Sequence, residues 1–117
     1  MNEPRPPACS EADLPEPLPL NEERLAAIAK GLAHPARVKI IEQFREARPH
    51  MAHEIFEGSD LAQSTISEHL RILRKADIVF ATKDGPRTWY CLRRSVLRQF
   101  AHAVEDLTAE WVMISQQ

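Results

Sequence analysis

The apolar positions of the first half of the chain recur at helical spacing and predict three helices. The first helix begins after Asn21, because asparagine is a favoured N-cap residue. Its inward face, at positions i, i+3, i+4 and i+7, is formed by Leu25, Ile28, Ala29 and Leu32. The second helix begins at Pro35, a residue that suits a first turn, and ends by Pro49. Its inward positions are Val38, Ile41 and Phe44. A short third helix covers residues 52–57.

The second half of the chain predicts a fourth helix, a β-hairpin and a fifth helix. The fourth helix opens on the capping-box spacing of Asp60 and Gln63. Its apolar stripe consists of Ile66, His69, Leu70 and Leu73, with His69 expected to be a packed histidine that supports the helix. Residues 78–83 and 87–92 are then β-branched and aromatic, with a turn of about three residues between them. The last helix starts near Ser95, and its apolar face consists of Val96, Phe100, Ala103, Val104, Leu107 and Trp111.

These elements make the fold class mainly α with a small β-hairpin. Residues 1–20 hold six of the nine prolines, which remove backbone donors and fix φ, so they are predicted to form a mobile tail. Residues 21–117 then form one folded domain. The last helix is also apolar beyond its main stripe, at Leu97, Ala101, Val112 and Ile114. A helix with two apolar faces indicates two partners, here the core and a second subunit.

The charge is distributed unevenly along the chain, although the net charge is only −2. Residues 61–98 carry eight Lys or Arg and three Asp or Glu, whereas residues 1–20 carry one basic and four acidic groups. Residues 99–117 carry three acidic groups and no Lys or Arg. A basic block between acidic flanks is typical of a local phosphate-binding surface. The alternative is that the basic residues cluster by chance on a solvated surface. The sequence motifs distinguish between these two interpretations.

The outward face of the fourth helix carries side chains that suit a helix lying in the major groove. Gln63, Ser64 and Ser67 offer small hydrogen-bonding groups for base edges and phosphates, and Arg71 adds a cation. The short helix before it completes a helix-turn-helix. Positive charge continues beyond the helix at Arg74, Lys75, Lys83 and Arg87. The last two flank the hairpin turn, where a wing contacts backbone phosphates.

Three segments resemble the ArsR/SmtB family of winged helix-turn-helix transcriptional repressors, in the order of that family. Residues 32–41 (LAHPARVKII) are similar to its second-helix signature, residues 63–73 to its recognition helix, and residues 84–92 to its wing and closing strand. The resemblance implies a homodimer, joined through the first and last helices, that binds a palindromic operator and represses transcription. It implies that the residues facing DNA are Gln63, Ser64, Thr65, Ser67 and Arg71. Ala62 departs from the family, which usually has a capping serine there, so the cap would move to Ser59 or Asp60.

The family resemblance also raises the question of an inducer, since members are often released from DNA by metal or metalloid ions. The third-helix site of the family needs a cysteine pair, but residues 51–54 read Met-Ala-His-Glu. The last-helix site needs two histidines, and this helix offers only His102, near Glu105. The simpler interpretation is that these side chains are charged residues of an exposed helix face. No metal or cofactor is therefore predicted, and His102 and Glu105 are the side chains that come nearest to a metal site.

The two cysteines leave two interpretations open. Cys9 lies in the proline-rich tail and Cys91 in the second hairpin strand, which excludes a disulfide framework and favours a reducing cytoplasm. A tail that folds back could bring Cys9 to Cys91 of the same or the other subunit, as a redox pair. The preferred interpretation is two unrelated thiols. Regulation without any ligand is a third possibility, so the inducing signal is left unknown.

The remaining patterns exclude several classes of function. No apolar run approaches the roughly 18 residues of a membrane span, and no secretory signal opens the chain. With three glycines there is no glycine-rich phosphate loop, and no nucleophile–base pair stands out, so the protein is not expected to be an enzyme. The prediction is a cytoplasmic, homodimeric, DNA-binding transcriptional repressor. The alternative is a winged-helix domain for protein contact, which would place apolar or acidic residues on the outward face of the fourth helix.

Overall fold

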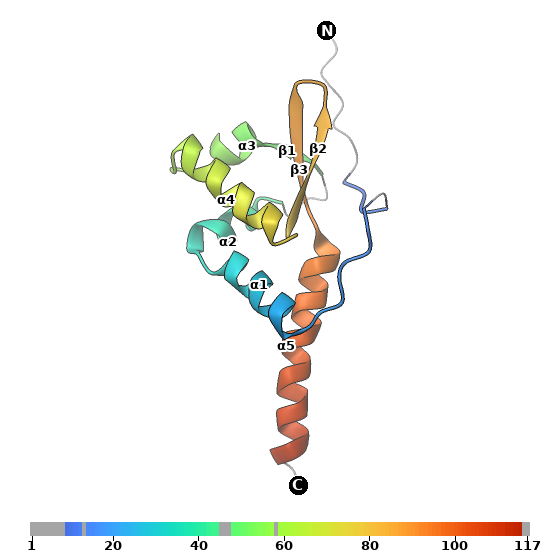
Figure 1. Ribbon diagram of the computed structural model, residues 1–117. Helices are drawn as coiled ribbons and strands as arrows, with labels where there is room; N and C mark the ends of the chain where they lie inside the picture. The colour runs from blue at the N-terminus through green and yellow to red at the C-terminus, as the bar shows by residue number, and fades with distance from the viewer. Residues whose placement is uncertain (1–8, 13, 45–47, 58, 116–117) are drawn as a thin grey trace.

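The computed structural model describes residues 9–12, 14–44, 48–57 and 59–115, with side chains as far as residue 108. Five helices and a three-stranded antiparallel sheet make up this part of the chain (Figure 1). In chain order these elements are α1 (Glu22–Leu32), α2 (Pro35–Glu42), β1 (His50–Met51), α3 (Ala52–Glu57), α4 (Gln63–Lys75), β2 (Val79–Asp84), β3 (Arg87–Leu92) and α5 (Arg94–Ser115). The predicted fold class is confirmed, and the short strand β1 is an addition to it.

The helix starts follow from local hydrogen bonds, with one departure from the sequence prediction. Asn21 caps α1 as predicted, because its Oδ1 accepts from the backbone N–H of Arg24 at 2.8 Å. The predicted capping box of α4 is wrong, because its N-cap is Ala62, which makes no side-chain cap bond. Ser59 Oγ instead accepts from the N–H of Leu61 at 3.0 Å, so this hydroxyl stabilises the turn before the helix.

The core forms where one face of each helix meets one face of the sheet. Its largest fully buried side chains are Phe44, Ile28, Ile40, Ile55, Ile66, Leu70, Leu73, Ile78, Val79 and Val96. The apolar stripe predicted for α4 is confirmed, since all four of its residues are buried. Val38 of α2 was predicted to face inward and is 43% exposed. Ile40 takes that place at 1% exposed, and a residue two positions away lies on the opposite side of a helix.

The strand order of the sheet is β1-β3-β2. Asp84 pairs with Arg87, so the turn has two residues rather than about three, and Gly85 adopts a φ of 60° there. Tyr90 and Leu92 of β3 pack against the core. Trp89 and Cys91 point to the other side of the sheet, because side chains alternate along a strand.

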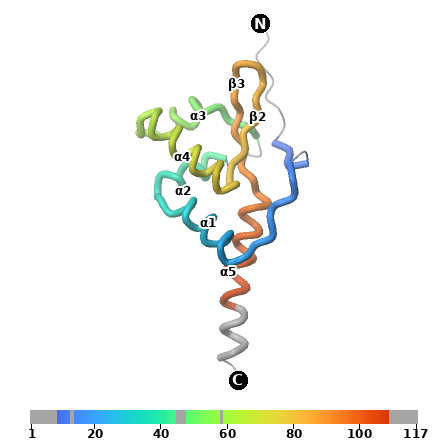
Figure 2. The backbone as a smooth tube through the Cα atoms, in the orientation of Figure 1, coloured from blue at the N-terminus to red at the C-terminus, as the bar shows by residue number. Residues whose placement is uncertain are grey.

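The N-terminal segment, residues 9–20, contains no helix or strand among its described residues. It runs from beside the hairpin past the first turns of α5 to the start of α1 (Figure 2). Side chains anchor it to β3 and α5, so this part of the predicted mobile tail is docked on the domain. Prolines remove backbone donors but leave side chains and carbonyl groups available for packing.

Helix α5 extends beyond the rest of the domain, and its C-terminal half projects away from the other elements (Figure 1). Of its predicted apolar face, Val96 is buried and Phe100 packs against the core. Val104 and Leu107 are 42% and 59% exposed. Trp111, Val112 and Ile114 lie outside the residues whose side chains are described. This single chain therefore leaves an apolar stretch of α5 uncovered.

Candidate nucleic-acid interface

The exposed face of α4 brings together the residues that the sequence assigned to DNA. The buried stripe at positions 66, 69, 70 and 73 holds one side of the helix against the core. The opposite side is exposed and presents Gln63, Ser64, Thr65, Ser67 and Arg71. Helix α3 packs against α4, and together they form the predicted helix-turn-helix. Because half of α4 is embedded in the core, the short polar side chains are held on a rigid element.

A surface ion pair sits in the middle of this face. Arg71 donates through Nη2 to Glu68 Oε1 at 2.7 Å and through Nε to Oε2 at 3.0 Å. The hydrogen bond from Arg71 lowers the pKa of Glu68, and the same bond raises the pKa of Arg71. Both side chains are more than half exposed, so water screens the pair and it contributes little to stability. Arg71 can therefore leave Glu68 for a phosphate at little cost.

The basic residues of α4 continue into a groove between α1 and α4. Arg71 and Lys75 line it from α4, and Lys30 and Arg37 line it from α1 and α2. The groove has a volume of about 370 Å³ and no acidic side chain in its lining. Sequence reasoning identified two of these four cations and missed Lys30 and Arg37. Such a groove favours an anionic group, because the charged side chains that line it are all positive.

His69 supports α4 from below, as predicted. It is 8% exposed, and its Nδ1 lies 3.3 Å from Arg37 Nη1. Arg37 also donates through Nε to the carbonyl of Gly31 at 2.7 Å, which links α4 to the end of α1. Burial lowers the pKa of His69, and the neighbouring His34 and Arg37 lower it further. These effects favour the neutral ring, whose Nδ1 accepts from the Arg37 guanidinium. Position 37 could have been noticed as the one charged residue between Pro35 and Val38 in the second-helix signature.

The predicted wing residues lie apart from α4. Lys83 and Arg87 are exposed on either side of the hairpin turn. The hairpin projects at the end of the molecule opposite to the C-terminus of α5 (Figure 1). Arg74 is exposed at the last turn of α4. The structure thus divides the predicted cations between the exposed face of α4 and the hairpin tip.

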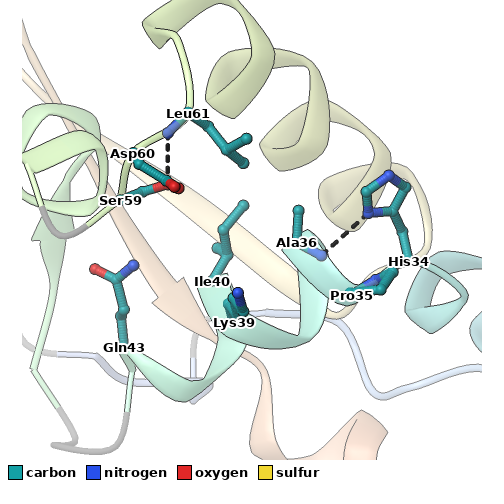
Figure 3. Close-up of a pocket in the computed structure, with 9 residues that line it drawn as sticks. All are labelled: His34, Pro35, Ala36, Lys39, Ile40, Gln43, Ser59, Asp60 and Leu61. Carbon is teal, nitrogen blue, oxygen red and sulfur yellow. Dashed lines mark hydrogen bonds between the residues drawn. The ribbon is translucent and has the colours of Figure 1, made fainter.

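A cavity of about 480 Å³ lies between α2 and the turn before α4 (Figure 3). Lys39 and Gln43 line it from α2, and Ser59, Asp60 and Leu61 line it from the turn. Its lining carries charges of both signs, from Lys39 and Asp60. Within the described residues, no three His, Cys, Asp or Glu side chains are grouped so as to hold a metal ion. His102 and Glu105 are exposed on α5, away from this cavity.

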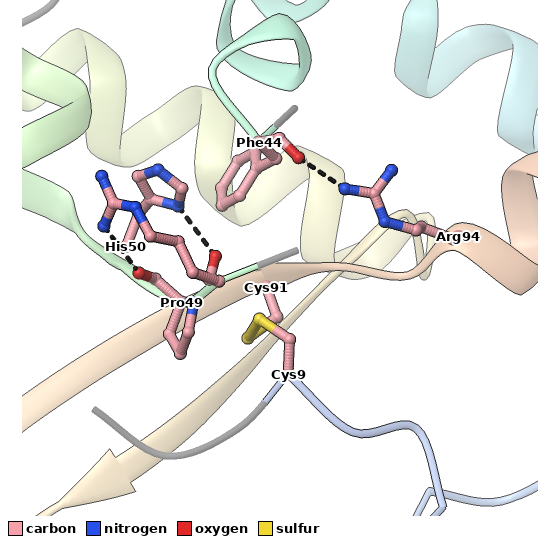
Figure 4. Close-up of a disulfide and its surroundings, with 7 residues drawn as sticks. Cys9, Phe44, Pro49, His50, Cys91 and Arg94 are labelled. Atoms are coloured by element: carbon pink, nitrogen blue, oxygen red, sulfur yellow. Dashed lines mark hydrogen bonds between the residues drawn. A yellow bond between two sulfur atoms is a disulfide. The ribbon is translucent and has the colours of Figure 1, made fainter. Parts of the chain in front are cut away.

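The two cysteines are joined by a disulfide in this structure (Figure 4). Cys9 of the N-terminal segment bonds to Cys91 of β3 of the same chain, with a Cα–Cα distance of 5.7 Å. The preferred interpretation of two unrelated thiols is therefore wrong. The sequence could not decide this point, because 82 positions separate the two residues and only the path of the tail brings them together.

No helix in the part of the chain that the structure describes is both long and apolar enough to cross a membrane.

Comparison with known folds shows the same architecture. The structure of an ArsR-like transcriptional regulator from Rhodococcus sp. RHA1 superimposes with a TM-score of 0.73 at 21% identity, covering 80% of this chain and 88% of that chain. The homodimeric winged helix-turn-helix DNA-binding domain Mb0332 from Mycobacterium bovis gives a TM-score of 0.60 at 24% identity, covering 77% and 82%. At these identities the similarity establishes the fold alone.

Sequence comparison establishes the family. Residues 34–80 match the family described as bacterial regulatory protein, arsR family. The chain is 34% identical over 84 residues to the HTH-type transcriptional repressor SmtB of Mycobacterium tuberculosis, covering 68% of this chain and 62% of the length of SmtB. It is 32% identical over 85 residues to an uncharacterized HTH-type transcriptional regulator of Methanocaldococcus jannaschii, covering 73% of this chain and 96% of that relative. This chain therefore belongs to the arsR family of bacterial regulatory proteins.

Proposed function

We propose that this protein is a sequence-specific DNA-binding transcriptional repressor that acts as a homodimer on a palindromic operator. The observation that carries the proposal is the exposed face of α4, where amide and hydroxyl groups precede Arg71 and Lys75 on a helix whose other side is buried. A glutamine reads adenine through two hydrogen bonds, and small hydroxyl side chains permit close approach to the groove. Lys83 and Arg87 would contact phosphates beside the site.

The distribution of exposed apolar side chains favours DNA over a protein as the partner of α4. Among the described residues, the large exposed apolar side chains are Leu18, Val38, Val104 and Leu107, and none of them lies on α4. A protein-binding helix face would need apolar anchors at its centre. The relative SmtB is named a transcriptional repressor, which supports the same assignment. We assign no catalytic reaction to the protein and place it in the cytoplasm, where an operator is accessible.

The uncovered stretch of α5 supports the dimer. Val104 and Leu107 are exposed on a helix that projects from the domain, and a second copy of the chain would bury them. The similar Mycobacterium bovis domain is described as homodimeric. A two-fold axis through α1 and α5 would present two copies of α4 to two half-sites, which is the reason to expect a palindromic operator.

The test is the selection of bound duplexes from a random library. The wild-type protein is expected to enrich a palindrome at low salt. Gln63→Ala and Ser67→Ala should lose or relax the preference at one position of each half-site, at a cost of about 1–3 kcal/mol per lost base contact. Ser10→Ala, which removes an exposed hydroxyl that bonds only the nearby N–H of Ala12 in the described residues, is the control and should select the same palindrome. A folded and dimeric wild-type protein that enriches no sequence would refute the proposal and make protein-partner capture the next step.

A further inference from the structure

The side of the sheet that faces away from the core is apolar and covered. Trp89 and Cys91 lie outside the core cluster, yet they are only 4% and 1% exposed. The strand register places Met51 and Thr82 beside Trp89, and Phe80 beside Cys91, on this same side. We call these five residues, four of them apolar, the outer face. An antiparallel sheet with water on one side normally carries polar residues there, so an apolar outer face requires a cover.

The N-terminal segment is attached to this side at Cys91 and then along the start of α5. Cys9 bonds to Cys91. The carboxylate of Glu11 accepts from Arg93 Nε at 3.2 Å and from the backbone N–H and hydroxyl of Ser95. Further on, the carbonyl of Pro15 accepts from Arg93, and the carbonyl of Leu18 accepts from Gln99 Nε2 at 3.2 Å.

One buried cation connects this segment to the candidate recognition helix. Arg93 is 5% exposed and donates through Nη1 to Asp77 Oδ2 at 2.7 Å. Asp77 lies between α4 and β2 with a φ of 63°, so it is the residue at which the chain turns from the recognition helix into the hairpin. Arg24 of α1 contacts the same carboxylate oxygen at 3.4 Å. The anchored segment, the end of α4 and helix α1 therefore share one ionic network.

We propose that Cys9 and Cys91 form a reversible thiol–disulfide site whose oxidised state holds the N-terminal segment on the outer face and strengthens DNA binding. The effect on DNA rests on the function proposed above. The reactants are small thiols and small disulfides. In the reducing cytoplasm a structural disulfide is rare, whereas a transient regulatory one is typical, which favours a reversible bond here.

The exchange balances without any bound cofactor. A small dithiol attacks the sulfur of Cys9, which is partly exposed, and the sulfur of Cys91 leaves as a thiolate. The second thiol of the dithiol then attacks the mixed disulfide, which releases Cys9 and closes the dithiol into a cyclic disulfide. Two electrons pass to the protein, and the two protons of the dithiol end on the two cysteines. Oxidation by a small disulfide runs through the corresponding mixed disulfide and releases two small thiols.

The direction of the effect follows from the network around Asp77. When the bond opens and the segment leaves, Arg93 loses Glu11 and Pro15 and becomes accessible to water. Its bond to Asp77 then fixes the junction of α4 and the hairpin less firmly. A helix and a hairpin that must contact one duplex together bind it more tightly when their relative position is already fixed. The oxidised protein is therefore the tighter binder.

The test compares the full chain, oxidised with glutathione disulfide and reduced with dithiothreitol. Mass spectrometry after alkylation counts the thiols, fluorescence of Trp89 in a Trp111→Phe background reports on the outer face, and titration with the selected duplex gives Kd. Reduction should release two thiols, shift Trp89 emission to longer wavelength and raise Kd about fivefold or more. Cys9→Ser, which keeps only Cys91, should give the reduced Trp89 emission and the reduced Kd under both conditions, whereas Ser10→Ala should behave as wild type.

Each other outcome decides a separate part of the proposal. Two results would overturn the site. In one, Cys9 and Cys91 do not form a disulfide within one chain; in the other, Trp89 emission is the same whether the disulfide is open or closed. An unchanged Kd with a responding Trp89 would overturn the effect on DNA. The thiol count and the Trp89 emission can be measured without DNA. If both change as expected but the protein binds no specific duplex, the disulfide site is confirmed and the proposed function is refuted. Glu11→Gln, which keeps both cysteines, should shift Trp89 emission partway while the bond stays closed.

Discussion

Replacing Arg93 by methionine measures how strongly one buried cation holds the fold together. The side chain is 6% exposed and donates to Asp77, Glu11 and the carbonyl of Pro15. Burial alone would lower the pKa of Arg93, but its bonds and charge interactions with Asp77 and Glu11 outweigh burial and raise it. The guanidinium therefore stays charged throughout the working pH range, and methionine removes a permanent charge while keeping most of the packed hydrocarbon.

The size of the effect can be worked out bond by bond. The short bond to Asp77 is charge-assisted and is worth about 1.5–3 kcal/mol. Glu11 and Asp77 are 30% and 34% exposed, so water screens both pairs, and the longer Glu11 contact adds about 0.5–1 kcal/mol. After the replacement Asp77 keeps Arg24 as a partner, which limits the loss. The free energy of unfolding should therefore fall by about 2–4 kcal/mol, near the range seen when a buried ion pair loses one partner.

Urea unfolding followed by circular dichroism is the assay. Both proteins are compared oxidised and at one concentration, because the stability of a dimer depends on concentration. Arg98→Met is the control, since Arg98 is exposed one turn further along α5 and should cost less than about 0.5 kcal/mol. A loss for Arg93→Met no larger than that of the control would refute the reasoning that this network stabilises the fold.

Three further results are expected. Gly31→Val should lower the free energy of unfolding by about 1–3 kcal/mol, because even a Cβ at Gly31 would lie 2.9 Å from the Cβ of Ala76; an unchanged midpoint in calorimetry would show that α1 can move away. Because burial and neighbouring positive charge lower the pKa of His69, the folded state binds fewer protons than the unfolded state, so stability should fall as the pH drops below about 6.5. His69→Gln should flatten this part of the urea-midpoint profile, and a profile as steep as wild type would contradict the assignment. Lys83→Gln should reduce the slope of log K against log salt by about 1.8 for a dimer, one phosphate contact per subunit; an unchanged slope would remove the hairpin from the interface.

Local patterns in the sequence were sufficient for most of the candidate interface. The stripe of α4 repeats every three or four residues, so both its buried side and its polar side could be assigned before any tertiary structure was known. The cap at Asn21 is equally local, since its partner N–H is three residues away. The hairpin followed from the change to a period of two around a glycine turn. These features depend on neighbours within a turn of helix or across one hairpin, and the sequence displays those neighbours directly.

Tertiary structure decided the features whose partners are far apart in the chain. Strand β1 has two residues, too few for any period, and exists because His50 meets Tyr90. The exposure of Val38 depended on which side of α2 met the core. Cys9 meets Cys91, and Arg93 meets Asp77 and Glu11, only because the N-terminal segment crosses β3 and α5. The sequence alone determined the exposed polar face of α4 because its periodicity is local. The ionic network of Arg93, Asp77 and Glu11 depended on tertiary packing, because the spacing of residues along the chain does not show which distant side chains will come into contact.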